Sequence, residues 1–192
     1  MANPHTLQDL VARAIARITG TGVITDVSGW HRQMDAVLAR GHTAAVIAGV
    51  AERSVGGRIR AALSHVLGMR ALARPDRDLL LSRLTEQRRY LANFANDVQR
   101  GALTPAQIVA RAALYAAATR ATYSAARWSD AYLPAHPGDG SSECLVHCQC
   151  QWVQRADGYY WTLGTSEHCP TCLRRASEWS PYRATTLSSS ET

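Results

Sequence analysis

The sequence predicts a mainly α-helical protein, either a helical bundle or an extended helical body, with a small β-hairpin module at its C-terminus. Apolar residues recur at helical spacing through the first two thirds of the chain. All five cysteines lie beyond residue 143, in Cys144-Leu-Val-His-Cys148-Gln-Cys150 and Cys169-Pro-Thr-Cys172. The length of 192 residues and the hydrophobic content of 46% are sufficient to bury a core.

The first half of the chain predicts three helical segments. An amphipathic pattern over residues 6–19 ends at Gly20. Ser28 is placed to cap a second helix, which we expect to end at Gly41. A nearly uncharged run over residues 43–51 follows, and Gly56-Gly57 then predicts a break or hinge, since glycine weakens a helix.

Two longer helices are expected next. Pro75 suits a first helical position, and the helix that it opens is expected to stop at Gly101. Thr104 and Gln107 have the spacing of a capping box at the start of a helix over residues 105–131. Its many alanines offer a surface that a neighbouring helix can approach closely. We expect these two helices to form an antiparallel pair joined by a short turn.

The last part of the chain predicts a separate module. Residues 133–143 are rich in proline, glycine and serine and predict an irregular linker after a helical body at 1–132. Strands are expected at 148–153 and 159–163, around the turn Ala156-Asp157-Gly158, followed by a short helix at 173–179. The cysteine-rich module then spans 144–183, and residues 184–192 are expected to form a flexible tail.

The spacing of the cysteines predicts a zinc-ribbon-like site for one Zn2+. Zinc prefers four thiolate or imidazole ligands in a tetrahedron, and two short turns with two ligands each supply them. Cys169 and Cys172 form one such pair, and two of Cys144, Cys148 and Cys150 supply the rest, with the choice left open. His147 and His168 adjoin cysteines, where a side chain tends to point away from the shared ligand position.

Two other uses of the cysteines compete with zinc. Disulfides are one, although five is an odd number and the chain shows no secretory signal. Cys169-Pro-Thr-Cys172 is also similar to the redox dithiol of thioredoxin-like proteins. Such a dithiol follows a strand in an alternating strand and helix pattern, whereas this one follows a hairpin at the end of a helical chain.

Charge divides the chain unevenly. All 21 basic residues are arginine; residues 1–132 carry 17 of them against 9 acidic residues, a net +8, and residues 133–192 carry 4 against 6, a net −2. The helical body is therefore the part suited to a polyanion or an acidic protein surface. We expect no membrane contact, since no segment has the roughly 18 consecutive apolar residues of a spanning helix.

The sequence contains none of the familiar catalytic motifs. It lacks a Gly-rich phosphate loop, a His-Glu-x-x-His helix and a Gly-x-Ser-x-Gly elbow. We therefore expect no enzymatic activity and no catalytic residues.

The second half contains the loop Pro137-Gly-Asp-Gly140, the string Cys148-Gln-Cys150-Gln-Trp152 and the pair Cys169-Pro-Thr-Cys172. Together with several shorter strings, they resemble the C-terminal part of tailed-phage and prophage minor head proteins, also called head-morphogenesis proteins. The resemblance covers roughly residues 75–183. Its most specific parts are the Pro137-Gly-Asp-Gly140 loop and Cys148-Gln-Cys150-Gln-Trp152. Further matching strings are Arg111-Ala-Ala-Leu-Tyr115, Thr122-Tyr123, Leu133-Pro-Ala-His-Pro137, Cys144, Trp161-Thr-Leu163 and Glu167-His-Cys169-Pro-Thr-Cys172.

This resemblance implies a structural virion protein that is assembled into the head in the cytoplasm of a bacterial host. The resemblance implies the major capsid or portal protein as partner. The alanine-rich face of residues 108–126 and the uncharged run 43–51 predict association with these proteins or with further copies of the chain, and the excess of arginine suits non-specific contact with packaged DNA. Cys148 and Cys150 carry over as residues of its cysteine module. The alternative is a zinc-binding regulatory protein that binds nucleic acid, against which the net negative charge of residues 133–192 argues.

Overall fold

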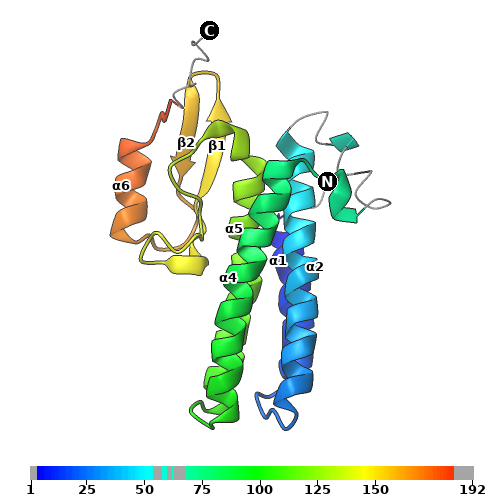
Figure 1. The fold of residues 1–192 in the computed structure, drawn as a ribbon. Coiled ribbons are helices and arrows are strands. Elements are labelled where there is room, and N and C mark those ends of the chain that lie inside the picture. Colours follow the sequence, from blue (N-terminus) through cyan, green and yellow to red (C-terminus); the bar gives the residue numbers. More distant parts are fainter. Residues whose placement is uncertain (1–3, 54–57, 60–61, 63–67, 184–192) are drawn as a thin grey trace.

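The computed structural model describes residues 4–53, 58–59, 62 and 68–183, and over these it confirms a mainly helical fold. Four helices lie side by side: α1 (Pro4–Thr19), α2 (Val27–Arg53), α4 (Arg74–Gln99) and α5 (Pro105–Arg127) (Figure 1). A short 3-10 turn, η1 (Gly68–Ala71), precedes α4. Among the described helices, none is both long and apolar enough to cross a membrane.

The second helix is longer than its sequence pattern predicts. We expected it to end at Gly41, but α2 continues through Gly41 and includes the uncharged run that follows it. Gly41 serves close packing: a Cβ there would lie 2.9 Å from Val11 Cγ2 and 3.2 Å from Thr119 Cγ2. The predicted break at Gly56-Gly57 lies outside the described residues, as does the tail at 184–192.

Glycine and alanine bring α2 and α5 into close contact. A Cβ on Gly49 would lie 2.6 Å from the Tyr123 carbonyl oxygen and 2.8 Å from Ala126 Cβ. Because Gly41 meets Thr119 and Gly49 meets Ala126, the two helices run parallel. The small-residue face of α5 is therefore covered mainly by α2 and α1 within the chain. The expected pair of α4 and α5 is antiparallel, but α4 packs chiefly on α2.

The helix ends are fixed by local hydrogen bonds. The Asp26 carboxylate, and not Ser28 as we predicted, caps α2, because Asp26 Oδ1 accepts a hydrogen bond from the Gly29 amide at 2.8 Å. The capping box of α5 is confirmed: Thr104 Oγ1 accepts from the Gln107 amide, and Gln107 Oε1 accepts from the Thr104 amide. This helix ends at Arg127, earlier than predicted, and gives way to the 3-10 turn η2 (Ser129–Ala131).

The bundle has two apolar clusters. The larger one centres on aromatic contacts, in which the Trp30 ring meets Phe94 edge-on at 5.1 Å and Phe94 stacks on Tyr115 at 6.1 Å. The smaller cluster joins the C-terminal part of α2 to the first turns of α4, through Val46, Val50, Leu72, Leu80, Leu84 and Ala126.

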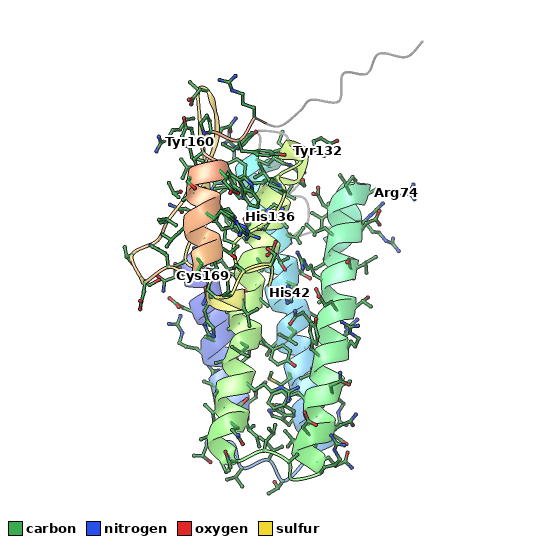
Figure 2. All side chains as sticks on the ribbon, turned by 90° about the vertical axis from the view of Figure 1, so that its left-hand side faces the viewer. His42, Arg74, Tyr132, His136, Tyr160 and Cys169 are labelled. Atoms are coloured by element: carbon green, nitrogen blue, oxygen red, sulfur yellow. The ribbon has the colours of Figure 1, made fainter. Side chains whose placement is uncertain are left out.

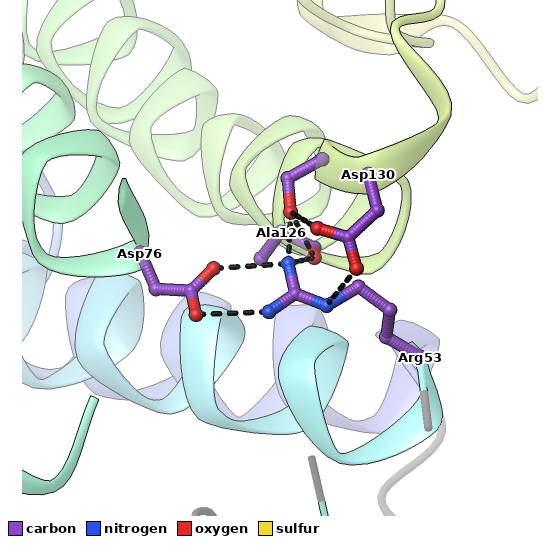
Figure 3. A network of polar contacts seen from close by, with 5 residues as sticks. Arg53, Asp76, Ala126 and Asp130 are labelled. Carbon is purple, nitrogen blue, oxygen red and sulfur yellow. Dashed lines mark hydrogen bonds and ion pairs between the residues drawn. The ribbon is translucent and has the colours of Figure 1, made fainter. Parts of the chain in front are cut away.

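A buried ion pair ties the ends of three helices together (Figure 3). Arg53, the last residue of α2, donates to both carboxylate oxygens of Asp76 in the first turn of α4, at 3.0 and 2.9 Å. Its guanidinium also bonds the Ala126 carbonyl at 3.3 Å and forms an ion pair with Asp130 at 3.1 Å. From the sequence, Asp76 is only a helix-dipole partner, but the structure places it at 1% exposure as the anchor of Arg53.

The C-terminal module combines a hairpin and a short helix. It contains the 3-10 turn η3 (Leu145–His147), strands β1 (Gln151–Arg155) and β2 (Gly158–Thr162), and α6 (Pro170–Glu178), and it lies against the upper part of α5 (Figure 1). The strands pair antiparallel, with Trp152 opposite Trp161. The first strand begins at Gln151, so Cys148 and Cys150 precede it and do not lie in a strand as we expected.

An aromatic core fills the module. Three tryptophans are in mutual contact: Trp152 meets Trp161 edge-on at 5.3 Å and stacks on Trp179 at 6.0 Å, and Trp161 meets Trp179 edge-on at 5.8 Å. The guanidinium of Arg175 lies over the rings of Trp161 and Trp179, at 5.1 and 4.8 Å. Trp152 also donates its indole N–H to the Ala135 carbonyl at 2.9 Å. The predicted linker is therefore part of the packed structure, because its backbone is held by the module that it introduces.

Candidate metal centre

The five cysteines converge on one region of the module, although they come from four different local structures. Cys144 precedes η3, Cys148 follows it, Cys150 directly precedes β1, and Cys169 and Cys172 lie at the start of α6. Figure 2 shows Cys169 at this end of α6. Two overlapping groups have all their sulfurs within 4.8 Å of one another: Cys144, Cys169 and Cys172, and Cys148, Cys150 and Cys172.

The sulfur separations suit a tetrahedral metal. Cys144 Sγ lies 3.7 Å from Cys172 Sγ and 3.6 Å from Cys169 Sγ, and Cys148 Sγ lies 3.6 Å from Cys172 Sγ. A zinc–sulfur bond is about 2.3 Å long, so the sulfurs of a tetrahedral zinc site lie about 3.8 Å apart. The cluster could therefore hold a metal ion, and Cys172 is the thiol that belongs to both groups.

The start of α6 presents the second cysteine pair. Cys169 occupies the N-cap position in extended backbone, and Pro170 follows in the first turn, where its missing N–H costs nothing. Cys172 then falls in the first turn and is 1% exposed. The side chain of Glu143, just before Cys144, accepts hydrogen bonds from the Thr171 hydroxyl at 2.8 Å and amide at 3.3 Å. The two cysteine segments are thereby joined without any metal.

Arg120, from the middle of α5, fixes the other cysteine loop. Its guanidinium donates to three successive carbonyl oxygens, those of Cys148 at 2.8 Å, Gln149 at 3.0 Å and Cys150 at 3.0 Å. This is a positioning residue that the sequence analysis missed. The one sequence signal for this role is that the charged side chain of Arg120 lies within a run of alanine and threonine. Such a pattern could have indicated a buried hydrogen-bond partner.

The neutral thiol form is favoured at two of the three buried cysteines. Burial raises the pKa of the Cys172 thiol, and a hydrogen bond with Cys150, together with burial, raises the pKa of Cys148. The same contact with Cys148 lowers the pKa of the Cys150 thiol. Several thiolates this close together repel one another, so the cluster ionises fully only when a bound cation compensates the charge.

The described residues offer little for the redox alternative. The dithiol of Cys169 and Cys172 stands beside three further thiols, and it follows a two-stranded hairpin. The two histidines beside the cysteines, His147 and His168, belong to neither close group of ligands. The structure thus brings together all five predicted cysteines and leaves both histidines outside the cluster.

Comparisons with known proteins identify no relative: no family model, no curated protein and no solved structure matches the chain.

Proposed function

We propose that the cluster binds one Zn2+ through Cys144, Cys169, Cys172 and Cys148, as a structural site. The convergence of the five sulfurs carries this proposal: Cys144, Cys169 and Cys172 form one close group, and Cys148 Sγ, 3.6 Å from Cys172 Sγ, is expected to close on an ion that these three hold. Four thiolate ligands leave no open position for a substrate. Cys150 is then the spare thiol. It lies within reach of Cys172 and can replace Cys148 when that ligand is lost.

Metal analysis of single variants tests the ligand set. Protein purified under reducing conditions without chelator should contain about one equivalent of zinc. Cys172→Ser should lose it, because Cys172 belongs to both groups, whereas Cys150→Ser should keep it and serves as the matched control. Metal-free native protein with two disulfides, or a Cys150→Ser variant that loses its zinc, would contradict the assignment.

We further propose that the protein is a structural component of a tailed-phage or phage-like particle, acting in head assembly without catalytic turnover. The residues that carry the resemblance to minor head proteins have architectural roles in this fold. Asp139 of the Pro-Gly-Asp-Gly loop accepts hydrogen bonds from the amides of His136 at 2.7 Å and Ser141 at 2.9 Å. Trp152 packs at the centre of the module. Motif residues that order a loop and fill a core favour a structural protein over an enzyme.

We expected association through the alanine-rich face of α5, but in the fold this face packs against other helices of the same chain. The small-residue face of α5 is already covered by α2 and α1, so it offers no free apolar patch for a partner. Two arginines of α4 and its C-cap are paired, Arg88 with Asp35 at 2.7 Å and Arg100 with Asp97 at 2.6 Å. We therefore propose that exposed arginines with no ion-pair partner among the described residues, such as Arg32 and Arg40 on α2, contact the capsid or portal protein or packaged DNA.

Incorporation into particles tests the virion role. A tagged chain expressed in its bacterial host during particle production should sediment with particles on a density gradient and resist nuclease treatment. The Arg32→Glu, Arg40→Glu double variant should incorporate less, as should the native chain at raised salt. The chain's absence from particles, together with sequence-specific DNA binding, would favour the regulatory alternative instead.

A further inference from the structure

A cavity of about 530 Å³ lies between α4, α5 and the loops that precede β1. Its walls are mainly apolar, with Leu114, Tyr115, Ala118 and Ala121 on α5 facing Tyr90 on α4. The Pro-Gly-Asp-Gly loop and η3 also line the cavity, through Asp139 and Leu145. Pockets of this size, apolar with a few polar groups, are typical binding sites for small molecules.

The charged groups around this cavity are already neutralised. Arg83 pairs with Glu86 at 3.3 Å, and Arg111 pairs with Asp97 at 2.7 Å. The carboxylate of Asp139 is engaged by the amides of its own loop. A charged ligand would have to lose its hydration without gaining a free counter-ion, so the lining favours a neutral one.

One buried nitrogen in the lining, Nε2 of His42, has no hydrogen-bond partner among the described residues. His42 of α2 is 0% exposed and lies in the interior of the bundle (Figure 2). Its Nδ1 is 2.8 Å from Thr122 Oγ1, and that hydroxyl donates its single proton to the Ala118 carbonyl at 3.4 Å. We infer that the hydroxyl keeps this bond to the carbonyl, so that Nδ1 carries the ring proton and Nε2, which has no hydrogen bond to the described residues, is an acceptor.

Burial also keeps this imidazole uncharged. The pKa of His42 is lowered to about 4, chiefly by burial and further by the charge of Arg83. The ring is thus neutral at pH 7, and its free nitrogen acts as a hydrogen-bond acceptor. An unsatisfied buried acceptor destabilises the protein, and a ligand that carries a donor removes this cost.

We propose that this cavity binds a neutral aromatic group bearing one hydroxyl or N–H donor, of the phenol or indole type, which donates to Nε2 of His42. The aromatic and aliphatic walls take the ring, and the imidazole fixes its orientation. A free small molecule and a tyrosine or tryptophan side chain of a partner protein share this chemistry. The inference stands independently of the zinc site and of the virion role.

Titration of the native protein with p-cresol tests the proposal, with toluene as the probe of the same shape that lacks the donor. We expect p-cresol to bind about 10-fold more tightly than toluene and to shift the Nε2 resonance of His42 in nitrogen NMR spectra. N-acetyltyrosinamide separates the two sources: if it also binds, the site takes a side chain; if p-cresol alone binds, the site takes a free molecule.

Two variants of one helix make the test specific. Leu114→Trp, at the mouth of the cavity where Leu114 is 38% exposed, should abolish p-cresol binding. Val109→Trp is the matched control, since Val109 is 40% exposed on α5 but does not line the cavity. Failure of p-cresol to bind the native protein, equal binding of toluene, or undiminished binding to Leu114→Trp would each overturn the proposal.

Discussion

Replacing Arg120 by methionine should weaken metal binding while leaving the helical bundle intact. Methionine retains much of the apolar stem of Arg120 but removes the donors that hold the carbonyls of Cys148, Gln149 and Cys150. The loop that carries two of the clustered thiols then loses its only arginine anchor among the described contacts with α5. The thiols remain present, but their separation from Cys172 is no longer fixed.

The magnitude follows from the three hydrogen bonds. A hydrogen bond from a charged donor contributes about 1.5–3 kcal/mol, and three such bonds to one group do not add in full. Burial lowers the pKa of Arg120, which reflects a cost of desolvating the guanidinium that offsets part of this gain. Groups that orient metal ligands typically change affinity by about 10–100-fold, or about 1.4–2.8 kcal/mol, and we expect a loss in this range.

Competition with a chromophoric zinc chelator at pH 7, under reducing conditions, measures this loss. Arg111→Met is the matched control, because Arg111 lies on the same helix and pairs with Asp97 without touching the cysteine loop. Its zinc affinity should equal that of the native protein. If Arg120→Met binds zinc as tightly as Arg111→Met, the loop is ordered by the metal alone and the positioning role is refuted.

Three further predictions concern the bundle, and urea unfolding measures each. Gly49→Val should lower the free energy of unfolding by about 3 kcal/mol, since a Cβ at this position already lies 2.6 Å from α5. The control Ala36→Val, on the exposed face of α2, should lower it by less than about 1 kcal/mol. Equal losses would contradict the close approach of the two helices. Asp76→Ala should lower the free energy of unfolding by about 3 kcal/mol, because it leaves Arg53 without its main buried partner. Asp78→Ala should lower it by less than about 1 kcal/mol, because the Asp78 carboxylate pairs with arginine at the surface. Similar losses for the two variants would argue against Asp76 as the anchor of Arg53. Histidine in the unfolded chain has a pKa near 6.5, and His42 in the fold has a pKa of about 4. The contribution of the neutral His42 ring to the free energy of unfolding is therefore complete above pH 6.5 and is lost as the pH falls toward 4. Between pH 7 and pH 4.5, His42→Gln should therefore lose about 2–3 kcal/mol less stability than the native protein, and an identical pH dependence would refute the buried neutral ring.

Local signals in the sequence were sufficient for the helical class of the body, for the start of α5 and for the pairing of Cys169 with Cys172. The start of α5 is specified by Thr104 and Gln107, which satisfy each other's backbone groups without help from the rest of the chain. Cys169 and Cys172 are likewise placed together by one helical turn. The module of hairpin and short helix follows from turn residues and aromatic runs of short range.

Gly41 is a position where reasoning from local sequence signals gave the wrong helix boundary. From the sequence, Gly41 predicted the end of a helix, because an isolated glycine weakens helices and often ends them. In the fold it lies inside α2, where the absence of a side chain admits Val11 and Thr119. Its role depends on helices that are distant in sequence, and no local pattern records their approach.

The sequence by itself determined the helical body, the hairpin module and the five candidate ligands, because each depends on residues close along the chain. Only the tertiary structure decided that Cys172 is shared by two groups of sulfurs, that Arg120 holds the loop of Cys148 and Cys150, and that His42 has an unpartnered nitrogen beside a cavity. These features join residues about 30 to 80 positions apart. Such long-range contacts arise from the packing of whole helices and loops, which residue spacing along the chain does not encode.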